Sequence, residues 1–173
     1  MVTPPCCGYT LHMPKVRPIP KGYHTVTPGL AVQGADAFIK FCKKAFGAKE
    51  LGRLPGPGGS VMHAELEIGD SRIMVGEEMP GMGNASAKTL GGCPISLFIY
   101  VTDVDAAFKK AVKAGATALM PPADMFWGDR YCRLSDPSGH SWALATHIED
   151  VSPKEMKKRA KAFMAAMAEK PAQ

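Results

Sequence analysis

The sequence predicts an α+β fold of two β-α-β-β-β modules, with an additional C-terminal helix. Strand-like and helix-like patterns occur in the same order twice along the chain. A motif also recurs after each helix pattern, because residues 47–51 (GAKEL) align with residues 115–119 (GATAL), a period of about 68 residues. Such a period is too long for a solenoid repeat and fits a duplicated half-domain.

The first module is predicted over residues 22–78. A strand at 25–32 contains Pro28, which confines this strand to an edge or a bulge. Residues 34–47 predict a helix, because apolar residues recur at helical spacing and the last glycine suits the left-handed position after a helix end. Three more strands are expected, separated by glycine-rich turns: 48–54, 61–68 and 71–76.

The second module is predicted over residues 94–150, after a loop rich in Gly, Met and Ala. Its elements repeat the order of the first: a strand at 95–101, a helix at 103–115, and strands at 116–127, 129–135 and 140–147. Residues 152–155 have the composition of a capping box, so a helix is expected from about Pro153 within a C-terminal segment, 151–173. Residues 1–21 are expected to form an N-terminal extension.

The composition argues against a nucleic-acid partner and against a membrane span. The formal net charge is +5, but its two basic stretches do not interleave aromatic residues with basic ones as a single-strand binding groove does. No run of roughly 18 apolar residues is present. The five cysteines form no C-x-x-C pair, which favours reduced thiols and a cytoplasmic location and leaves an organelle open.

Strand alternation sorts the side chains of two strands onto two faces of the sheet. The residues expected under the helices are Met62, Ala64, Leu66, Ile68, Ile95, Leu97, Ile99 and Val101. The opposite face then carries His63, Glu65, Glu67, Ser96, Phe98 and Tyr100. This mixed polar and aromatic surface suits a small-molecule pocket. Alternatively, the other module or a second subunit covers this face and the same residues are interface packing.

Three segments resemble the glyoxalase, bleomycin-resistance and extradiol-dioxygenase superfamily, also called vicinal oxygen chelate proteins: 34–53 (GADAFIKFCKKAFGAKELGR), 103–116 (DVDAAFKKAVKAGA) and 136–144 (DPSGHSWAL). Four others look most like its PhnB-like branch: 23–32, 62–71, 126–131 (FWGDRY) and 144–152. The resemblance covers about residues 22–160. It implies that the two modules form a curved eight-stranded mixed sheet around a cleft, usually in a dimer.

The resemblance also implies where a metal would bind. Metal-dependent members place four ligands, mostly His and Glu, on the first and last strands of each module. Carried over by position, these ligands fall near Thr27, Met74, Ser96 and Ala143, which are not a competent set for a divalent metal. The sequence therefore predicts no metal and no cofactor.

The FWGDRY segment provides further candidates. Trp127 and Arg130 are predicted to bind ligand, as an aromatic wall and a fixed cation suited to a planar or anionic molecule. The alternative is that Asp129 or Asp136 pairs with an arginine to fix a strand junction. His140 is expected near the rim of the core, beside Trp142.

Three functions follow as hypotheses. The first is a homodimer that binds a small, partly aromatic or anionic molecule without metal, using Phe98, Tyr100, Trp127 and Arg130. The second is a glyoxalase- or lyase-type enzyme, with His63 and Glu65 as its acid-base pair and Arg130 or Tyr100 stabilising developing charge. The third is a subunit of a larger complex, bound through the C-terminal helix.

Overall fold

The computed structural model describes residues 16–79 and 81–168. The first module comprises β1 (Gly29–Val32), α1 (Ala35–Phe46), β2 (Lys49–Pro55), a 3-10 turn (Pro57–Gly59), β3 (Val61–Ile68) and β4 (Ser71–Glu77). The second comprises β5 (Ser96–Tyr100), α3 (Val104–Lys113), β6 (Thr117–Asp124), β7 (Asp129–Ser135) and β8 (Ser141–His147), with the short α2 (Ala87–Leu90) before it. Helix α4 (Pro153–Ala168) follows.

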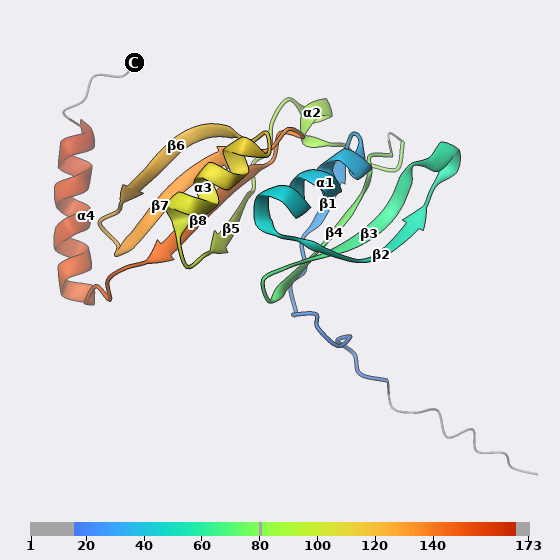
Figure 1. Ribbon diagram of the computed structural model, residues 1–173. Coiled ribbons are helices and arrows are strands. Elements are labelled where there is room, and N and C mark those ends of the chain that lie inside the picture. The colour runs from blue at the N-terminus through green and yellow to red at the C-terminus, as the bar shows by residue number, and fades with distance from the viewer. Residues whose placement is uncertain (1–15, 80, 169–173) are drawn as a thin grey trace, which may run out of the picture.

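Hydrogen bonds join the strands into two four-stranded sheets, ordered β1-β4-β3-β2 and β5-β8-β7-β6 (Figure 1). In each sheet the first strand of the module pairs parallel with the last, and the other pairings are antiparallel. The predicted α+β class with two β-α-β-β-β modules is confirmed. Its eight strands are shared between two sheets, and a cleft between the modules is bordered by the edge strand β5 on one side and by the segment before β1 on the other.

The duplication extends to the position of a β-bulge. In β2 the pairing register shifts between Glu50 and Gly52, so Leu51 has no partner. In β6 it shifts between Ala118 and Met120, which leaves Leu119 without one. These two leucines are the aligned positions of the internal repeat. Because a bulge bends its strand, both outer strands curve at the same point.

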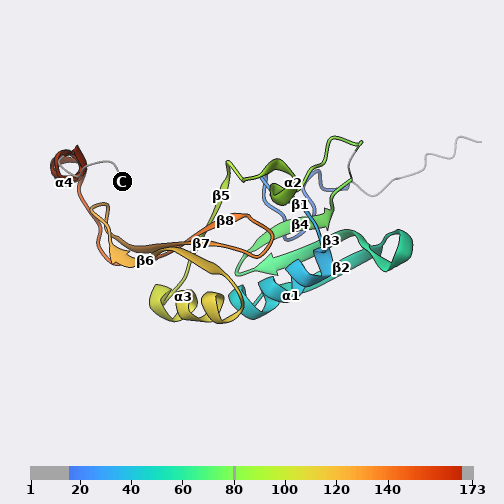
Figure 2. The same ribbon diagram turned by 90° about the horizontal axis from the view of Figure 1, so that it is seen from above.

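Helices α1 and α3 cover one face of both sheets, while α2 and α4 lie on the other side (Figure 2). The core lies under α1 and α3 and runs through both modules, since the ring of Phe46 on α1 lies 4.5 Å from that of Trp142 on β8. The face away from α1 and α3 is called the open face below. No helix among the described residues is long and apolar enough to cross a membrane.

Strand alternation assigned most core residues of β3 and β5 correctly and failed at two positions, Met62 and Ile95. Ala64, Leu66 and Ile68 are buried as predicted. Met62 is 40% exposed, and Val61 is buried in its place. The cause is a second bulge: Leu54 pairs with His63 and Pro55 pairs with Val61, so Met62 is skipped.

Ile95 was also predicted to face the helices, and it is exposed. Strand β5 begins one residue later, at Ser96, so Ile95 lies in the connection before the sheet. The other three apolar residues of this strand, Leu97, Ile99 and Val101, pack against the core as expected.

The turn between β7 and β8 is organised by the buried carboxylate of Asp136. Its Oδ1 accepts hydrogen bonds from the backbone N–H groups of Ser138 (2.7 Å) and His140 (3.1 Å), and its Oδ2 accepts one from Trp142 Nε1 (2.7 Å). His140 is buried next to Phe38, which confirms its predicted place. The alternative in which Asp136 pairs with an arginine is wrong, because turn and indole donors occupy both of its oxygens.

Candidate functional site

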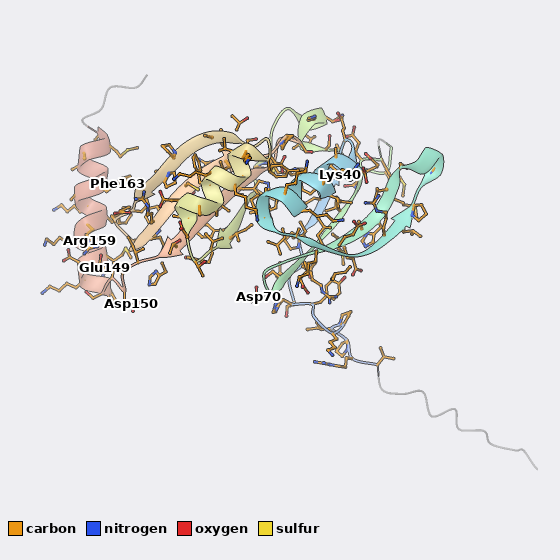
Figure 3. The ribbon with its side chains drawn as sticks, in the orientation of Figure 1. Lys40, Asp70, Glu149, Asp150, Arg159 and Phe163 are labelled. Carbon is orange, nitrogen blue, oxygen red and sulfur yellow. The ribbon has the colours of Figure 1, made fainter. Side chains whose placement is uncertain are left out.

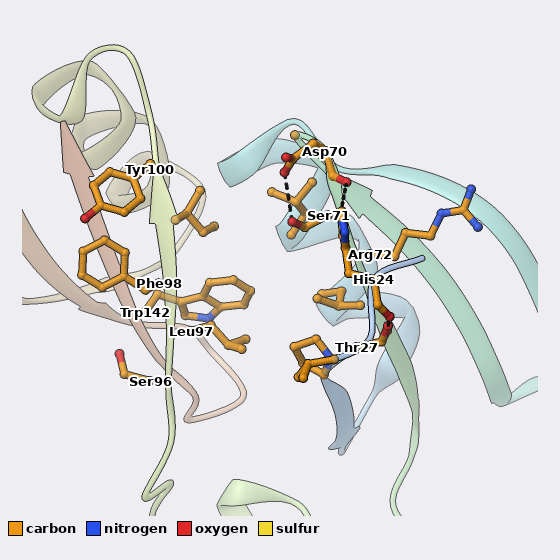
Figure 4. A pocket seen from close by; sticks show the side chains of 16 residues that line it. His24, Thr27, Asp70, Ser71, Arg72, Ser96, Leu97, Phe98, Tyr100 and Trp142 are labelled. Carbon is orange, nitrogen blue, oxygen red and sulfur yellow. Dashed lines mark hydrogen bonds between the residues drawn. The ribbon is translucent and has the colours of Figure 1, made fainter. Parts of the chain in front are cut away.

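A cleft of about 530 Å³ separates the two modules. Figure 4 shows Ser96, Phe98 and Tyr100 of β5 along one wall and Trp142 beside them. The Phe98 and Tyr100 rings lie 5.0 Å apart and remain 48% and 64% exposed. Because exposed aromatic rings lose unfavourable contact with water when a ligand covers them, this wall suits an apolar, planar molecule.

The opposite wall belongs to the first module and carries most of the polar side chains of the cleft. It consists of the segment before β1 and the turn between β3 and β4 (Figure 4). The His24 Nε2 lies 3.4 Å from the Asp70 carbonyl oxygen, and the Ser71 hydroxyl donates to the Asp70 carboxylate at 3.0 Å. Thr27 also lines this wall. These residues offer hydrogen-bonding groups across from the rings.

Sequence reasoning did not assign this polar wall. Strand β1 runs parallel to β4, with Gly29 opposite Met74, and the Met74 N–H donates to the Pro28 carbonyl at 2.8 Å. The residues just before β1 therefore lie beside those at the start of β4. Parallel pairing of the first and last strands of the module would have indicated this neighbourhood.

The structure brings His63 and Glu65 together, but outside this cleft. Both lie on the open face of β3, with His63 Nε2 3.8 Å from Glu65 Oε1. His63 lines a separate depression of about 240 Å³ with Met62 and Met74. The Glu65 carboxylate and burial raise the pKa of the neighbouring Tyr23, although the Tyr23 hydroxyl makes no hydrogen bond of good geometry.

Trp127 is connected to the aromatic wall. It lies in the turn before β7, and its ring contacts that of Tyr131 at 5.6 Å between centroids. Tyr131 in turn lies 5.8 Å from Phe98. The open face of the second module thus carries a row of four rings, Trp127–Tyr131–Phe98–Tyr100, which we call the ring row.

Arg130 does not join this group. Its side chain lies on the helix-covered face of β7, where Nε and Nη2 donate to both oxygens of Asp105 on α3 at 2.6 and 2.9 Å. Nη1 donates to Asp124 at 2.8 Å. Alternation makes this placement necessary, because Asp129 and Tyr131 occupy the open face. Arg72 lies at the edge of the cleft, but its guanidinium points away from the β5 wall (Figure 4) and lies over the Tyr23 ring at 4.6 Å.

Asp129 ties several of these residues together. Its side chain is buried, and Oδ2 accepts hydrogen bonds from the Tyr100 hydroxyl (3.1 Å) and Trp127 Nε1 (3.0 Å), while Oδ1 contacts His147 Nδ1 (2.8 Å). Burial, followed by the Asp129 carboxylate, raises the pKa of Tyr100. Hydrogen bonding to Asp129 and then Asp150 raises the pKa of His147. The alternative in which Asp129 pairs with an arginine is therefore wrong.

The residues at the metal-ligand positions do not form a metal site. Thr27 and Ser96 line the cleft with hydroxyl groups, and Ala143 is buried opposite Phe98 on β8. Within residues 16–79 and 81–168, no three His, Cys, Asp or Glu side chains are grouped so that they could hold a metal ion. Two hydroxyls, a thioether and a methyl group are not a donor set that binds a catalytic divalent metal.

A duplicated β-α-β-β-β fold with a cleft between its modules defines a class of proteins, and similarity to known sequences and structures identifies it. The model of the Glyoxalase/Bleomycin resistance protein/Dioxygenase superfamily matches residues 23–144, and the chain belongs to this superfamily. Uncharacterized proteins of Mycobacterium bovis and Mycobacterium tuberculosis are 42% identical to it over 134 residues, which is 76% of this chain and 88% and 79% of theirs.

Solved structures share the fold. TioX from Micromonospora sp. ML1 is 27% identical, with a TM-score of 0.59 over 71% of this chain and 98% of its own. A gene product of Arabidopsis thaliana is 26% identical, with a TM-score of 0.58 over the same shares. TnmS3, an antibiotic binding protein from Streptomyces sp. CB03234, is 20% identical, with a TM-score of 0.54 over 72% of this chain and 95% of its own. The likeness to TnmS3 shows the fold alone.

Proposed function

We propose that this protein binds a small, partly aromatic or anionic molecule in the cleft between its modules, without a metal ion. The observation that carries the proposal is the cleft itself, with exposed Phe98 and Tyr100 rings on one wall and hydrogen-bonding groups on the other. A volume of about 530 Å³ falls within the range of drug-sized ligand sites. TnmS3, which has the same fold, is described as an antibiotic binding protein.

The two walls suggest how the ligand lies. A planar part stacks on Phe98 and Tyr100, whose rings together offer a broad apolar surface. A polar or anionic part faces His24, Thr27 and Ser71 on the first module. Arg130 has no part in this arrangement, because the carboxylates of Asp105 and Asp124 already neutralise it. Trp127 does not line the cleft and acts indirectly, because its ring packs on Tyr131, which in turn contacts Phe98.

We further infer that the protein is a cytoplasmic homodimer of the PhnB-like branch. The first module exposes the apolar side chains of Leu54 and Met62, which do not line the cleft, and a second copy would cover them. The described cysteines Cys42, Cys93 and Cys132 are unpaired, in keeping with a reducing compartment. Analytical ultracentrifugation at micromolar concentration tests the dimer, and a single monomer peak contradicts it.

Thermal-shift screening followed by calorimetry tests ligand binding. The compounds are metabolites and aromatic antibiotics, and we expect at least one to raise the melting temperature of the wild type. The Phe98→Ala variant should lose this stabilisation, because half of the stacking surface is gone. Phe163→Ala is the matched control, since this phenylalanine lies on α4 outside the cleft. The proposal fails if no compound stabilises the wild type, or if Phe98→Ala responds equally.

A second candidate is a glyoxalase- or lyase-type enzyme. The observation that favours it is the contact between His63 and Glu65 on the open face. This candidate lacks a group to stabilise developing charge, because Arg130 lies on the opposite face and Tyr100 lines the separate cleft and donates its hydroxyl hydrogen to Asp129. Turnover of hemithioacetals by the wild type, lost in His63→Ala, would establish this activity. Equal rates with both proteins would exclude a role for His63.

A third candidate is a subunit of a larger assembly. Helix α4 stands at the end of the second module, held at its base by Arg159, which donates to both oxygens of Glu149 at 2.7 Å (Figure 3). It exposes Met164 and Met167 together with several lysines. Elution of the protein from cell extract at the size of a large complex, abolished by truncation before Pro153, would support this role.

A further inference from the structure

Both ends of the ring row are fastened to one carboxylate oxygen. Tyr100 at one end and Trp127 at the other donate their hydroxyl and indole hydrogens to Oδ2 of Asp129, at 3.1 and 3.0 Å. The rings between them follow at centroid distances of 5.0, 5.8 and 5.6 Å. Hydrogen bonds and ring contacts therefore form a closed loop, Asp129–Tyr100–Phe98–Tyr131–Trp127–Asp129.

Asp129 is 4% exposed, and a buried carboxylate is stable only when hydrogen bonds satisfy it. Its donors come from three parts of the module: β5, the turn before β7, and His147 at the end of β8. Each donor loses rotational freedom in order to bond it. For Tyr100, whose ring is largely exposed, this bond to the sheet restricts a side chain that would otherwise sample several rotamers.

The same bonds determine which groups a ligand meets. Tyr100 and Trp127 each have a single polar hydrogen, and both hydrogens point to Asp129. In the cleft, the ring face of Tyr100 remains for the ligand, together with the lone pairs of its hydroxyl. A molecule on this wall is therefore recognised by stacking rather than by donated hydrogen bonds.

We propose that Asp129 is a positioning residue for the ligand-binding wall: by bonding Tyr100 and Trp127 it fixes the ring row in a stacking orientation before ligand arrives. This inference rests on the proposed binding function. It goes further by naming the residue that prepares the wall and by assigning the ligand a flat aromatic part. Preorganisation of this kind strengthens binding because no side chain has to be ordered when the ligand arrives.

Four variants test the proposal with anilinonaphthalene sulfonate, an aromatic and anionic dye. Asp129→Leu keeps the side-chain bulk but removes the acceptor. Asp129→Asn keeps a carbonyl oxygen for Tyr100 and Trp127 and turns its amide toward His147. Tyr100→Phe keeps the ring but removes its bond to Asp129, and the fourth protein combines Tyr100→Phe with Asp129→Leu. Far-UV circular dichroism confirms that each variant is folded.

We expect Asp129→Leu and Tyr100→Phe to bind the dye about three- to tenfold more weakly, the cost of ordering one freed side chain. The dye affinity of Asp129→Asn should stay within about twofold of that of the wild type, because the Asn side chain keeps the hydrogen-bond acceptor although it lacks the charge. The double variant should be no weaker than Asp129→Leu, because both changes break the same connection. The proposal is overturned if the loss of dye affinity in the double variant equals the product of the losses in the two single variants. It is also overturned if Asp129→Asn binds the dye as weakly as Asp129→Leu.

A ligand-free measurement separates this proposal from the binding function. Near-UV circular dichroism reports how firmly Tyr and Trp rings are held, and Phe98→Ala reports whether the dye occupies the cleft. If Phe98→Ala binds the dye as well as the wild type, the binding function fails at this wall. The near-UV spectrum then decides the positioning role alone: signal lost in Asp129→Leu and kept in Asp129→Asn supports it, and equal spectra overturn it.

Discussion

Replacing Asp136 with alanine removes the acceptor on which the turn between β7 and β8 depends. The side chain is 5% exposed, and three donors converge on it: two backbone N–H groups of the turn and the Trp142 indole N–H. Alanine has no side-chain acceptor for these donors. The donors of a strand-connecting turn and of a core tryptophan are thus left unpaired together.

Each buried donor left without a partner costs about 1 to 3 kcal/mol. The removal of a buried carboxylate offsets part of this sum, because a charged group leaves the protein interior. We expect Asp136→Ala to lower the free energy of unfolding by about 3 to 5 kcal/mol, a large share of the total for a domain of this size. At about 2 to 4 °C per kcal/mol, the melting temperature should fall by about 10 °C.

Urea denaturation, followed by tryptophan fluorescence and far-UV circular dichroism, measures this loss. The matched control is Asp70→Ala, which changes an exposed aspartate in the equivalent turn of the first module, between β3 and β4. Its cost should stay within about 0.5 kcal/mol, as for most surface substitutions. If Asp136→Ala unfolds within about 1 kcal/mol of the wild type at an unchanged denaturant slope, the three hydrogen bonds do not stabilise the turn as argued here.

Three more predictions concern stability. Gly128→Ala should cost more than about 2 kcal/mol in urea denaturation, because φ is +95° and a Cβ would overlap the Glu149 carbonyl oxygen; a neutral result contradicts this geometry. Hydrogen bonds from the Ser86 N–H, Thr89 and Gln33 lower the pKa of Glu78 to about 2. The contribution of Glu78 to the free energy of unfolding is therefore present above pH 4.5 and lost as pH falls toward 2. In the Glu78→Gln variant, the free energy of unfolding should change less with pH in that window. The pKa of His147 in the folded protein is raised above 6.5. The contribution of His147 to stability is therefore complete below pH 6.5 and is lost as pH rises through its pKa in the folded state. The melting temperature of His147→Gln, measured against pH, should lack this decline.

The sequence by itself determined the elements and their order. Local periodicities indicated which residues form strands and helices, and they sorted Ala64, Leu66 and Ile68 from His63 and Glu65 on β3. The repeated motif located the two modules. The strand and helix patterns depend on residues within a few positions of one another, and the repeat appears when two such segments are compared, so a single sequence is enough to show both.

The tertiary structure decided what those elements place together. The bulge at Met62 depends on how β2 pairs with β3, and the polar wall of the cleft depends on the parallel pairing of β1 with β4. Asp129 gathers donors from β5, the turn before β7 and β8, while Arg130, one residue later, turns to Asp105 on α3. Strand pairing and bulges are contacts between distant parts of the chain, and one residue of register moves a side chain to the other face of a sheet. That is why the sequence named Phe98, Tyr100 and Trp127 as candidates, while the structure was needed to find the carboxylate that joins Tyr100 to Trp127.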